Sequence, residues 1–335
     1  MKQKNIFITG GAGFIGSAIA KKLLEKGHKI TIYDNFSSGA EKNIEEIISR
    51  VRIIKGDIQD YDHLKKSMLH HDMVIHQAAQ LEITKAINNP EEDVKVNIMG
   101  SLNILKSMKE NGIRKLIIAS SACVYGNVEK YPAKEADVTH PNWEYGVSKL
   151  AVERYCDIYA DYEGFDIASL RYSIVYGKNE WYGRVLTILI KRAIENNDLV
   201  IFGKGDGRRD LINVEDVAEF NALLADKEWR GHEIFNVSSG KAVSINELGK
   251  IVKDIHYSEA GKKIKVLHED LEEGKFSHKV KGRMRLPREL KIMHLDNSKA
   301  KRFVPWKPTI KLKEGIKQEY HWLKRNPERW TNMSY

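Results

Sequence analysis

The stretch Gly10-Gly11-Ala12-Gly13-Phe14-Ile15-Gly16 follows a short apolar run and opens a segment with helical periodicity. A strand, a glycine turn and a helix in this order cradle a dinucleotide pyrophosphate against helix-terminal N–H groups. Gly10 permits the tight turn, Gly13 lets the backbone approach the pyrophosphate, and Gly16 packs helix on strand. The stretch therefore predicts a dinucleotide site, which includes Phe14 and Ile15 at the start of the helix.

Further candidate cofactor residues follow the next expected strands. Asp34 comes after residues 29–33, where a carboxylate suits a ribose 2′-hydroxyl and repels a 2′-phosphate, so NAD is favoured over NADP. Asp57 and Ile58 end the third strand, where a side chain can meet the adenine. Ala78 and Ala79 follow the fourth strand, and small residues there let the backbone approach the cofactor.

Strands and helices are expected to alternate through the first half of the chain. Strands separated by helices of this length form a parallel sheet with right-handed crossovers. We therefore expect an α/β fold, with a Rossmann-type doubly wound parallel sheet over residues 1–172. The looser pattern of residues 173–335 predicts a smaller C-terminal substrate-binding lobe, partly interwoven with the sheet. The expected strands are residues 5–9, 29–33, 52–55, 73–76, 115–120 and 167–171.

The composition limits the class of protein. Of the 335 residues, 42% are hydrophobic, which allows a sizeable core. The chain has no run of about 18 apolar residues, so no membrane span is expected. Cys123 and Cys156 provide neither a disulfide framework nor a zinc-ligand spacing, so we expect a cytoplasmic protein without a metal site. The net charge of +9 reflects lysines interleaved with glutamates rather than the aromatic-studded basic stripe of a nucleic-acid-binding protein.

A second group of residues carries acid–base chemistry. Tyr145 and Lys149 are four residues apart on an expected helix, residues 144–162, so they share one face of it. An ammonium group beside a phenol favours the phenolate, which can accept a proton. Ser121, at the end of an expected strand, can hold the same substrate oxygen. With a dinucleotide site on the same chain, these residues predict hydride transfer coupled to proton transfer.

Taken together, short motifs from about residue 5 to about residue 325 resemble the extended short-chain dehydrogenase/reductase family. Within that family the pattern is most similar to the NAD-dependent nucleotide-sugar epimerases and dehydratases, and nearest to the UDP-glucose 4-epimerases. The resemblance implies that Asn35, Gln80 and Asn97 also contact NAD. The motifs are the glycine stretch, Asp34-Asn35, Asp57-Ile58, His76-Gln77-Ala78-Ala79-Gln80, Asn97, Ser120-Ser121-Ala122-Cys123-Val124-Tyr125-Gly126, Tyr145-Gly146-Val147-Ser148-Lys149, Leu170-Arg171-Tyr172, Gly205-Asp206-Gly207, Arg209-Asp210 and Val214-Glu215-Asp216-Val217.

The resemblance implies a catalytic triad of Ser121, Tyr145 and Lys149. Tyr145 would take the proton of the sugar 4-hydroxyl while the C4 hydride passes to NAD. Ser121 would hold the oxygen, and Lys149 would bond the nicotinamide ribose. The 4-keto sugar then turns over and takes the hydride back on its other face. The implied function is a nucleotide-sugar 4-epimerase of the UDP-hexose type.

The resemblance also implies a nucleotide-sugar site in the C-terminal lobe. Val200 and Phe202 would flank the base, and Arg209 would bond the diphosphate. Arg285 or Arg288 would supply a second arginine, and both alternatives stay open. Arg184 stands near a position where the family commonly has asparagine, and Arg171-Tyr172-Ser173-Ile174 lacks another asparagine that contacts the diphosphate. These departures leave the nucleobase and the sugar open.

Two further residues leave the reaction open. The position two after the catalytic serine is acidic in the family's 4,6-dehydratases and uronic acid decarboxylases, whereas here it is Cys123. Glu82 replaces a small residue that usually lies beside the sugar. A Cys123–Glu82 pair would be an acid/base set for a 4,6- or 5,6-elimination by a dehydratase, whereas a cysteine that packs as a small hydrophobe favours epimerisation. The third alternative is a catalytically silent NAD-binding protein, against which the intact triad argues.

The same resemblance predicts the oligomeric state. The family pairs two helices of each subunit into a four-helix bundle. A homodimer through the helices of residues 91–110 and 144–162 is therefore implied.

Overall fold

The computed structural model describes residues 2–180 and 182–330, and it divides into two compact units. The chain leaves the first unit after Tyr172. It then returns twice, so two segments expected in the C-terminal lobe belong to the first unit instead. The first unit comprises Met1–Tyr172, Glu215–Val237 and Asp296–Lys307, and the second comprises Ser173–Val214, Ser238–Leu295 and Pro308–Tyr335.

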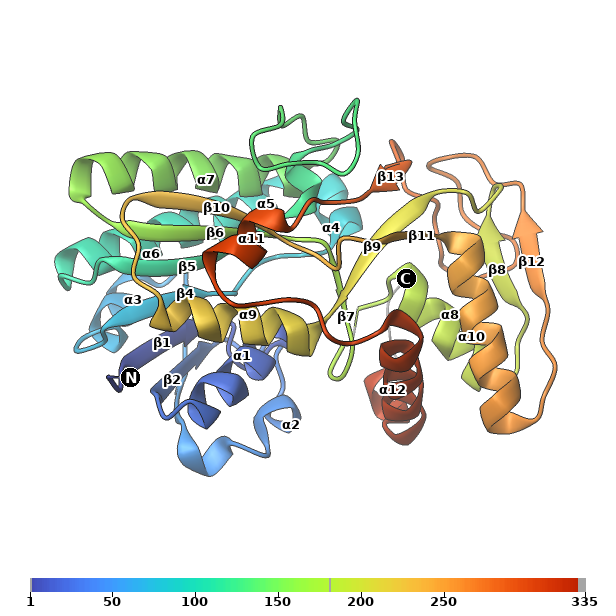
Figure 1. Ribbon diagram of the computed structural model, residues 1–335, viewed down its shortest axis with the longest axis horizontal. Helices are drawn as coiled ribbons and strands as arrows, with labels where there is room; N and C mark the ends of the chain where they lie inside the picture. Colours follow the sequence, from blue (N-terminus) through green and yellow to red (C-terminus); the bar gives the residue numbers. More distant parts are fainter. Residues whose placement is uncertain (1, 181, 331–335) are drawn as a thin grey trace. The chain divides into compact units, whose positions relative to one another are not determined.

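A seven-stranded parallel sheet forms the centre of the first unit (Figure 1). Its strand order is β10-β6-β5-β4-β1-β2-β3, which confirms the doubly wound α/β fold. The outermost strand, β10, pairs with β6 along its full length, and this pairing draws the returning segment into the first unit. The strands are β1 (Asn5–Thr9), β2 (Lys29–Asp34), β3 (Arg52–Lys55), β4 (Met73–His76), β5 (Lys115–Ser121), β6 (Asp166–Tyr172) and β10 (His232–Val237).

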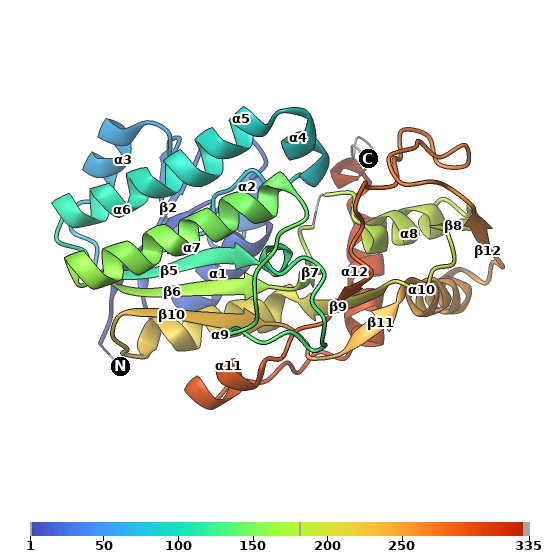
Figure 2. The ribbon, with the colours of Figure 1, turned by 90° about the horizontal axis from the view of Figure 1, so that it is seen from above.

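Helices cover both faces of this sheet. The helices α6 and α7 lie side by side over one face, and α1 and α9 cover the other (Figure 2). The helix α7 ends at Gly164, whose φ of 66° is the left-handed conformation that favours glycine at a helix end. The helical elements of this unit are α1 (Phe14–Glu25), α2 (Glu41–Ile44), η1 (Ile48–Arg50), α3 (Tyr61–Ser67), α4 (Ile83–Asn88), α5 (Pro90–Asp93), η2 (Val94–Met99), α6 (Gly100–Glu110), η3 (Ala122–Val124), α7 (Glu144–Glu163), α9 (Val214–Asp226) and α11 (Ser298–Phe303).

The helix expected over residues 91–110 is interrupted. The short helix α5 and the helix α6 are joined by one widened π-helical segment, η2. Gly100, at the junction of η2 and α6, lies so close to Ile58 that a Cβ there would be 2.5 Å from Ile58 Cδ1. The widened segment carries the buried Asn97, whose polar contacts inside the unit are described below. Periodicity in the sequence does not distinguish such a short π-helical segment from an ordinary helix.

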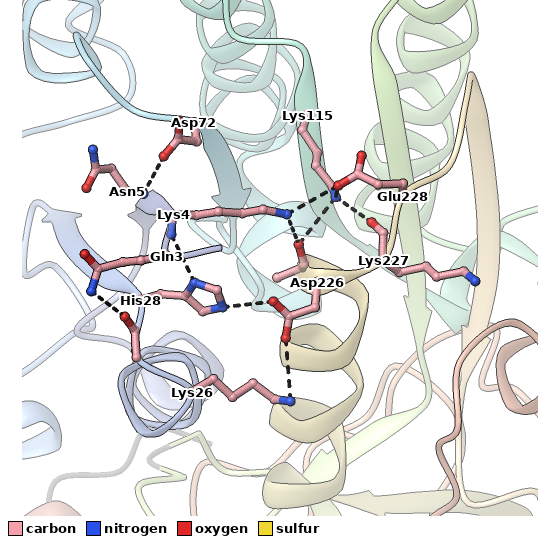
Figure 3. Close-up of polar contacts among 12 residues, drawn as sticks. Gln3, Lys4, Asn5, Lys26, His28, Asp72, Lys115, Asp226, Lys227 and Glu228 are labelled. Carbon is pink, nitrogen blue, oxygen red and sulfur yellow. Dashed lines mark hydrogen bonds and ion pairs between the residues drawn. The ribbon is translucent and has the colours of Figure 1, made fainter. Parts of the chain in front are cut away.

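Two lysines at the amino edge of the sheet cap the end of α9 (Figure 3). Lys4 Nζ donates to Ala225 O at 2.7 Å, and Lys115 Nζ donates to Lys227 O. The carboxylate of Glu228 accepts from both ammonium groups, at 3.5 and 3.2 Å. Carbonyls in the last turn of a helix lack intrahelical donors and carry partial negative charge, so two ammonium groups stabilise them. These contacts fix α9 against β1 and β5, at the edge of the sheet away from the glycine turn.

The second unit has its own core and smaller sheets. Buried side chains of α8, α10 and α12 pack together there, and Tyr176, Ile190 and Ile316 are among those with almost no exposed surface. Among the described residues, none of the helices is both long and apolar enough to cross a membrane. The elements are β7 (Ile174–Tyr176), α8 (Val185–Ile194), β8 (Leu199–Phe202), β9 (Arg208–Asn213), β11 (Ala242–Ser244), α10 (Ile245–Ala260), β12 (Val266–Glu269), β13 (Ile292–Met293), α12 (Leu312–Arg325) and η4 (Pro327–Arg329).

Candidate active site

The glycine turn forms a narrow cradle between β1 and α1. Gly10 has a φ of 67°, and a Cβ there would lie 2.6 Å from Ala78 N. A Cβ on Gly16 would lie 2.1 Å from Gly10 O, so the first turn of α1 meets the turn backbone directly. Gly13 occupies the N-cap of α1, and Phe14 and Ile15 are the first residues of that helix. The turn therefore presents helix-terminal N–H groups at the carboxyl end of β1, where an anion is stabilised.

Asp34 lies at this turn. Its Oδ2 accepts a hydrogen bond from Ala12 N at 2.9 Å, and its Oδ1 accepts one from Phe36 N at 2.9 Å. Burial raises the pKa of the Asp34 carboxyl, while these two N–H donors lower it. The segment of residues 39–43, for which the sequence predicted no role, also contacts this turn. Asn43 Nδ2 donates to Ala12 O at 2.8 Å. A Cβ on Gly39 would lie 2.9 Å from Asp34 Oδ1. In the sequence, only the Ser38-Gly39 dipeptide indicates that the backbone comes close to Asp34 here.

The ends of β2 and β3 are joined by side chains. Asn35 Nδ2 donates to Asp57 Oδ2 at 2.8 Å, and the other carboxylate oxygen of Asp57 accepts from Gln59 N at 2.8 Å. The structure thus brings two of the expected cofactor residues together. Ile58 is different, because its side chain packs in the core and is only 6% exposed.

The loop after β4 is held by Asn97. Its Oδ1 accepts from Gln80 N and its Nδ2 donates to Gln80 O, both at 2.9 Å, and Nδ2 also donates to Asp93 Oδ1 at 2.8 Å. Asn97 was expected to contact NAD, but its amide is occupied by these internal partners and the residue is 2% exposed. Its effect is to shape the backbone at Gln80, just beyond Ala78 and Ala79. The sequence could not reveal this, because the π-helical segment that carries Asn97 inward was not predicted.

The expected triad lies at the carboxyl end of β5 and in the first turns of α7. Ser121 ends β5, and its Oγ accepts from Cys123 N at 3.1 Å. Lys149 Nζ lies 5.8 Å from the centroid of the Tyr145 ring. Gly146 brings the two elements together, because a Cβ there would be 2.6 Å from Cys123 O. The start of α7 therefore packs on the turn that follows Ser121, a role for Gly146 that the motif contained but did not make evident.

Lys149 has a buried ammonium group. The residue is 5% exposed, and its Nζ donates to Ala119 O at 3.0 Å. Burial lowers the pKa of Lys149 to about 8, against the charges of Asp93 and Glu153, which raise it. His76, which also interacts with this charge, is neutral because burial lowers its pKa to about 3. A cation held inside the protein beside a phenol stabilises the phenolate more strongly than one in water.

Cys123 and Glu82 are held separately. Cys123 lies in η3 and is 7% exposed. Glu82 is half-buried at the N-cap of α4, and the side-chain amide of Gln80 bonds its backbone N–H and C=O. In the part of the chain that the structure describes, these hydrogen bonds tie Glu82 to Gln80. Within residues 2–180 and 182–330, no group of three or more histidine, cysteine, aspartate and glutamate side chains could hold a metal ion.

In the second unit, one carboxylate joins two of the expected arginines. Arg209 Nη2 donates to Glu289 Oε1 at 3.0 Å, and Arg285 Nε donates to Glu289 Oε2 at 3.2 Å. Arg288 is exposed, and its backbone N–H donates to Glu273 Oε2 at 2.8 Å. Sequence reasoning missed Glu289, although it lies four residues after Arg285. The geometry therefore groups Arg285 with Arg209.

The end of β8 contacts the same pair. Phe202 ends this strand, and the Cβ position of Gly203, with a φ of 63°, lies 3.3 Å from Arg285 Nη1. Val200 is 9% exposed in the middle of the strand. Arg184 is at the N-cap of α8, where its Nη1 donates to Val175 O at 3.0 Å. The structure brings Phe202 near Arg285 and gives Arg184 other partners.

Comparisons with known proteins agree along nearly the whole chain. The model of the NAD dependent epimerase/dehydratase family matches residues 6–238. A provisionally named UDP-glucose 4-epimerase of Methanocaldococcus jannaschii is 36% identical over 326 residues, which cover 96% of this chain and 99% of that protein. A UDP-N-acetyl-alpha-D-glucosaminuronate decarboxylase of Bacillus cytotoxicus is 30% identical over 330 residues, which cover 96% and 98%. The crystal structure of UDP-glucose 4-epimerase from Thermotoga maritima with UDP-glucose is 31% identical and superposes with a TM-score of 0.85 over 96% of this chain and 99% of that one.

Proposed function

Because the chain belongs to the NAD-dependent epimerase/dehydratase family, we propose that it is a nucleotide-sugar 4-epimerase acting on a UDP-hexose. NAD is the cofactor of this family. The observation that carries the proposal is the docking of the first turn of α7 on the segment after Ser121, through Gly146. This contact supports a site in which Tyr145 and Lys149 act together with the serine in a reversible oxidation at a sugar hydroxyl.

The residues around the glycine turn fit NAD. The turn has no room for side chains at Gly10 and Gly16, so the glycines let a phosphate come close to the start of α1. Asp34 is a buried carboxylate at the end of β2, suited to accept a hydrogen bond from a ribose hydroxyl. The chemistry that bound NAD supplies is the acceptance and the return of the C4 hydride.

The chain's own residues supply the proton transfer. Tyr145 Oη accepts the proton of the 4-hydroxyl as the hydride leaves C4, and gives it back when the hydride returns. Ser121 Oγ donates to the same sugar oxygen and holds it in place. The buried Lys149 ammonium stabilises the phenolate between the two half-reactions. No proton is removed from carbon, so no further acid/base pair is needed.

Cys123 favours epimerisation over elimination. An elimination needs a base for a carbon-bound proton and an acid for the leaving hydroxyl. Cys123 is buried in a 3-10 turn, and the contacts of Glu82 bind its backbone to Gln80 rather than directing it toward Cys123. We propose that Cys123 shapes the sugar pocket as a small side chain.

For the nucleotide we propose contacts with the second unit. Arg209 and Arg285 share Glu289, and a diphosphate would give each guanidinium a better acceptor than a shared carboxylate. Phe202 and Val200 would flank the base. Uridine is proposed because the relatives reported above are named for UDP-sugars.

We also propose that the protein forms a homodimer through η2, α6 and α7. Apolar side chains are exposed on these helices, including Met99 at 51%, Ile158 at 49% and Tyr162 at 84%. An apolar face of this kind on two adjacent helices is suited to pairing with its copy in a four-helix bundle.

The two thiols, Cys123 and Cys156, are both buried, which supports the proposal of a reducing, cytoplasmic location.

The test of the proposed function is incubation of the purified protein with a panel of UDP-, GDP-, CDP- and dTDP-hexoses without added cofactor. We expect a UDP-hexose to reach equilibrium with its 4-epimer at unchanged mass. Loss of water from the substrate would assign the protein to another reaction of the family. Turnover only with a different nucleotide would retain the reaction and reject uridine.

A further inference from the structure

A buried ion pair lies directly behind the proposed catalytic residues. Glu153 follows Lys149 by four residues on α7 and is 1% exposed. Arg171, on β6, donates from Nε to Glu153 Oε1 at 2.9 Å and from Nη2 to Glu153 Oε2 at 2.7 Å. This bidentate hydrogen bonding is a strong and geometrically specific interaction between an arginine and a carboxylate. It fixes the catalytic part of α7 to the sheet.

The pair also reaches the strand that carries Ser121. Ser120 Oγ donates to Glu153 Oε1 at 2.6 Å, and Ser120 lies opposite Arg171 in the pairing of β5 with β6. Ser120 immediately precedes Ser121. The Glu153 carboxylate therefore bonds the neighbour of Ser121, and Glu153 itself lies one helical turn after Lys149. The helix and the strand are thus joined within one residue of the proposed site.

Further contacts hold the guanidinium of Arg171. Its Nη1 donates to Glu135 O at 3.1 Å, and its central carbon lies 4.7 Å from the centroid of the Tyr125 ring. Tyr125 follows Ser121 by four residues, and its hydroxyl donates to Asn236 Oδ1 at 2.7 Å. Each of the three guanidinium nitrogens of Arg171 therefore has a hydrogen-bond partner.

We propose that Glu153 and Arg171 are positioning residues for the reaction, which hold Tyr145 and Lys149 in register with Ser121. The proposal rests on the proposed function. Burying two charges has a desolvation cost, and a well-packed apolar pair of similar volume is often as stable as a buried ion pair. Stability alone therefore does not require these two residues. The directional hydrogen bonds between Glu153 and Arg171 explain the presence of the pair, because they fix the positions of the reacting groups. Small displacements of such groups slow a reaction strongly.

Glu153 has a second effect through its charge. The charged or titratable groups around Lys149 are Glu153 and Tyr145 on α7, Asp93 on α5 and the neutral His76 on β4. Glu153 and Asp93 raise the pKa of Lys149, against its burial. Removal of the Glu153 charge lowers that pKa, and the phenolate of Tyr145 then loses part of its neighbouring positive charge.

The test compares Glu153→Gln with the apolar double variant Glu153→Met/Arg171→Met. The single variant leaves a buried guanidinium partly unpaired and should be unstable, whereas the double variant should unfold near the wild-type denaturant midpoint. We expect the double variant to retain NAD and to keep its KM within about twofold, while kcat falls by about tenfold or more. In both variants the alkaline limb of the kcat–pH profile should move to lower pH.

A titration that does not depend on turnover separates this proposal from the proposed function. Ionisation of Tyr145 is followed by ultraviolet difference absorbance against Tyr145→Phe. It should move to higher pH in the double variant, in which the Lys149 pKa is lowered and no unpaired Arg171 charge compensates. Asp166→Asn is the matched control, because Asp166 pairs with Arg230 at 3.0 Å at the opposite end of β6. It should leave kcat and the titration unchanged. A stable double variant with wild-type kcat, pH profile and Tyr145 titration would overturn the proposal, whereas an inactive wild-type protein would count against the proposed function alone.

Discussion

Tyr145 is the residue on which the proposed chemistry depends most. Replacement by phenylalanine keeps the ring and removes only the group that accepts the proton. A positioned acid/base contributes about 10²–10⁴-fold, so we expect kcat of Tyr145→Phe to fall by that factor with little change in nucleotide-sugar affinity. Steady-state kinetics and equilibrium binding measure the two quantities. Tyr257→Phe, at an exposed tyrosine of α10, is the control, and a Tyr145→Phe rate above about a tenth of wild type would exclude this role.

Cys123 and Glu82 distinguish epimerisation from elimination. In a 4-epimerase neither side chain transfers a proton, so Cys123→Ser and Glu82→Gln should each keep kcat within about tenfold, a loss of about 1.4 kcal/mol in transition-state stabilisation. In a dehydratase each substitution should cost about 10²-fold or more. Kinetics in deuterium oxide gives a second readout. Deuterium at C5 or C6 of the product would contradict epimerisation.

The chemistry-bearing residues could be predicted from the sequence, but their partners could not. Tyr145 and Lys149 can be recognised as candidates because a phenol and an ammonium group share one helix face, with Ser121 on a preceding strand. Their catalytic roles stay predictions. The choice between Arg285 and Arg288 depended on Glu289, which has no distinctive motif. The contacts of Asn97 with Gln80 were not predictable for a similar reason, since an amide that bonds the buried backbone has the same sequence signal as one displayed to a cofactor.

Strand positions followed closely from the sequence, because continuous apolar runs mark strands buried on both faces. The bounds of β1, β3 and β4 agree with the predicted ones, and β2, β5 and β6 extend them by one residue at one or both ends. The helix expected over residues 91–110 was wrong in its continuity. A π-helical segment conserves the apolar periodicity around it, so only the three-dimensional contacts of Gly100 and Asn97 reveal it.

The helix α12 contains an acidic residue that makes stability depend on pH. Glu319 is fully buried and faces Glu180, and Arg184 lies 3.8 Å from Glu180 as a partial counter-charge. Burial raises the pKa of Glu180 to about 7, and burial together with the charge of Glu180 raises the pKa of Glu319 as well. The folded protein therefore binds more protons than the unfolded chain, in which glutamate titrates near about 4.3. The free energy of unfolding should fall as the pH rises through about 7.

Glu319→Gln tests this pair. The amide supplies a permanent donor to the Glu180 carboxylate, so the loss of stability between about pH 5 and about pH 9 should become smaller. Urea denaturation at a series of pH values measures it. Glu314→Gln, at an exposed position of the same helix, should keep the wild-type slope. Equal slopes for the two variants would show that the pH dependence arises elsewhere.

The homodimer is a prediction for the whole molecule. Ile158→Glu puts a charge into the exposed apolar face of α7, where pairing with a second copy would bury it without a partner. We expect the variant to be a monomer by light scattering at micromolar concentration, while the wild type is a dimer. Tyr257→Glu introduces the same charge at an exposed tyrosine of α10 and should leave the dimer intact. A wild-type monomer would reject the interface.

The division of the chain was only partly predictable. The boundary near residue 172 followed from the end of the regular alternation of strands and helices. The return of residues 215–237 and 296–307 to the first unit did not, because pairing of β10 with β6 depends on contacts between segments far apart in the sequence. The sequence predicted a lobe partly interwoven with the sheet, but it did not indicate which segments return to the first unit.

Transfer of the C4 hydrogen tests the central claim most directly. Purified protein without added cofactor is incubated with UDP-hexose that carries deuterium at C4, and the products are analysed by mass spectrometry and NMR. We predict that the 4-epimer forms at unchanged mass with the deuterium still at C4, because the hydride is returned to the carbon that it left. Loss of the label from C4, loss of water, or accumulation of reduced NAD in proportion to product would contradict the account.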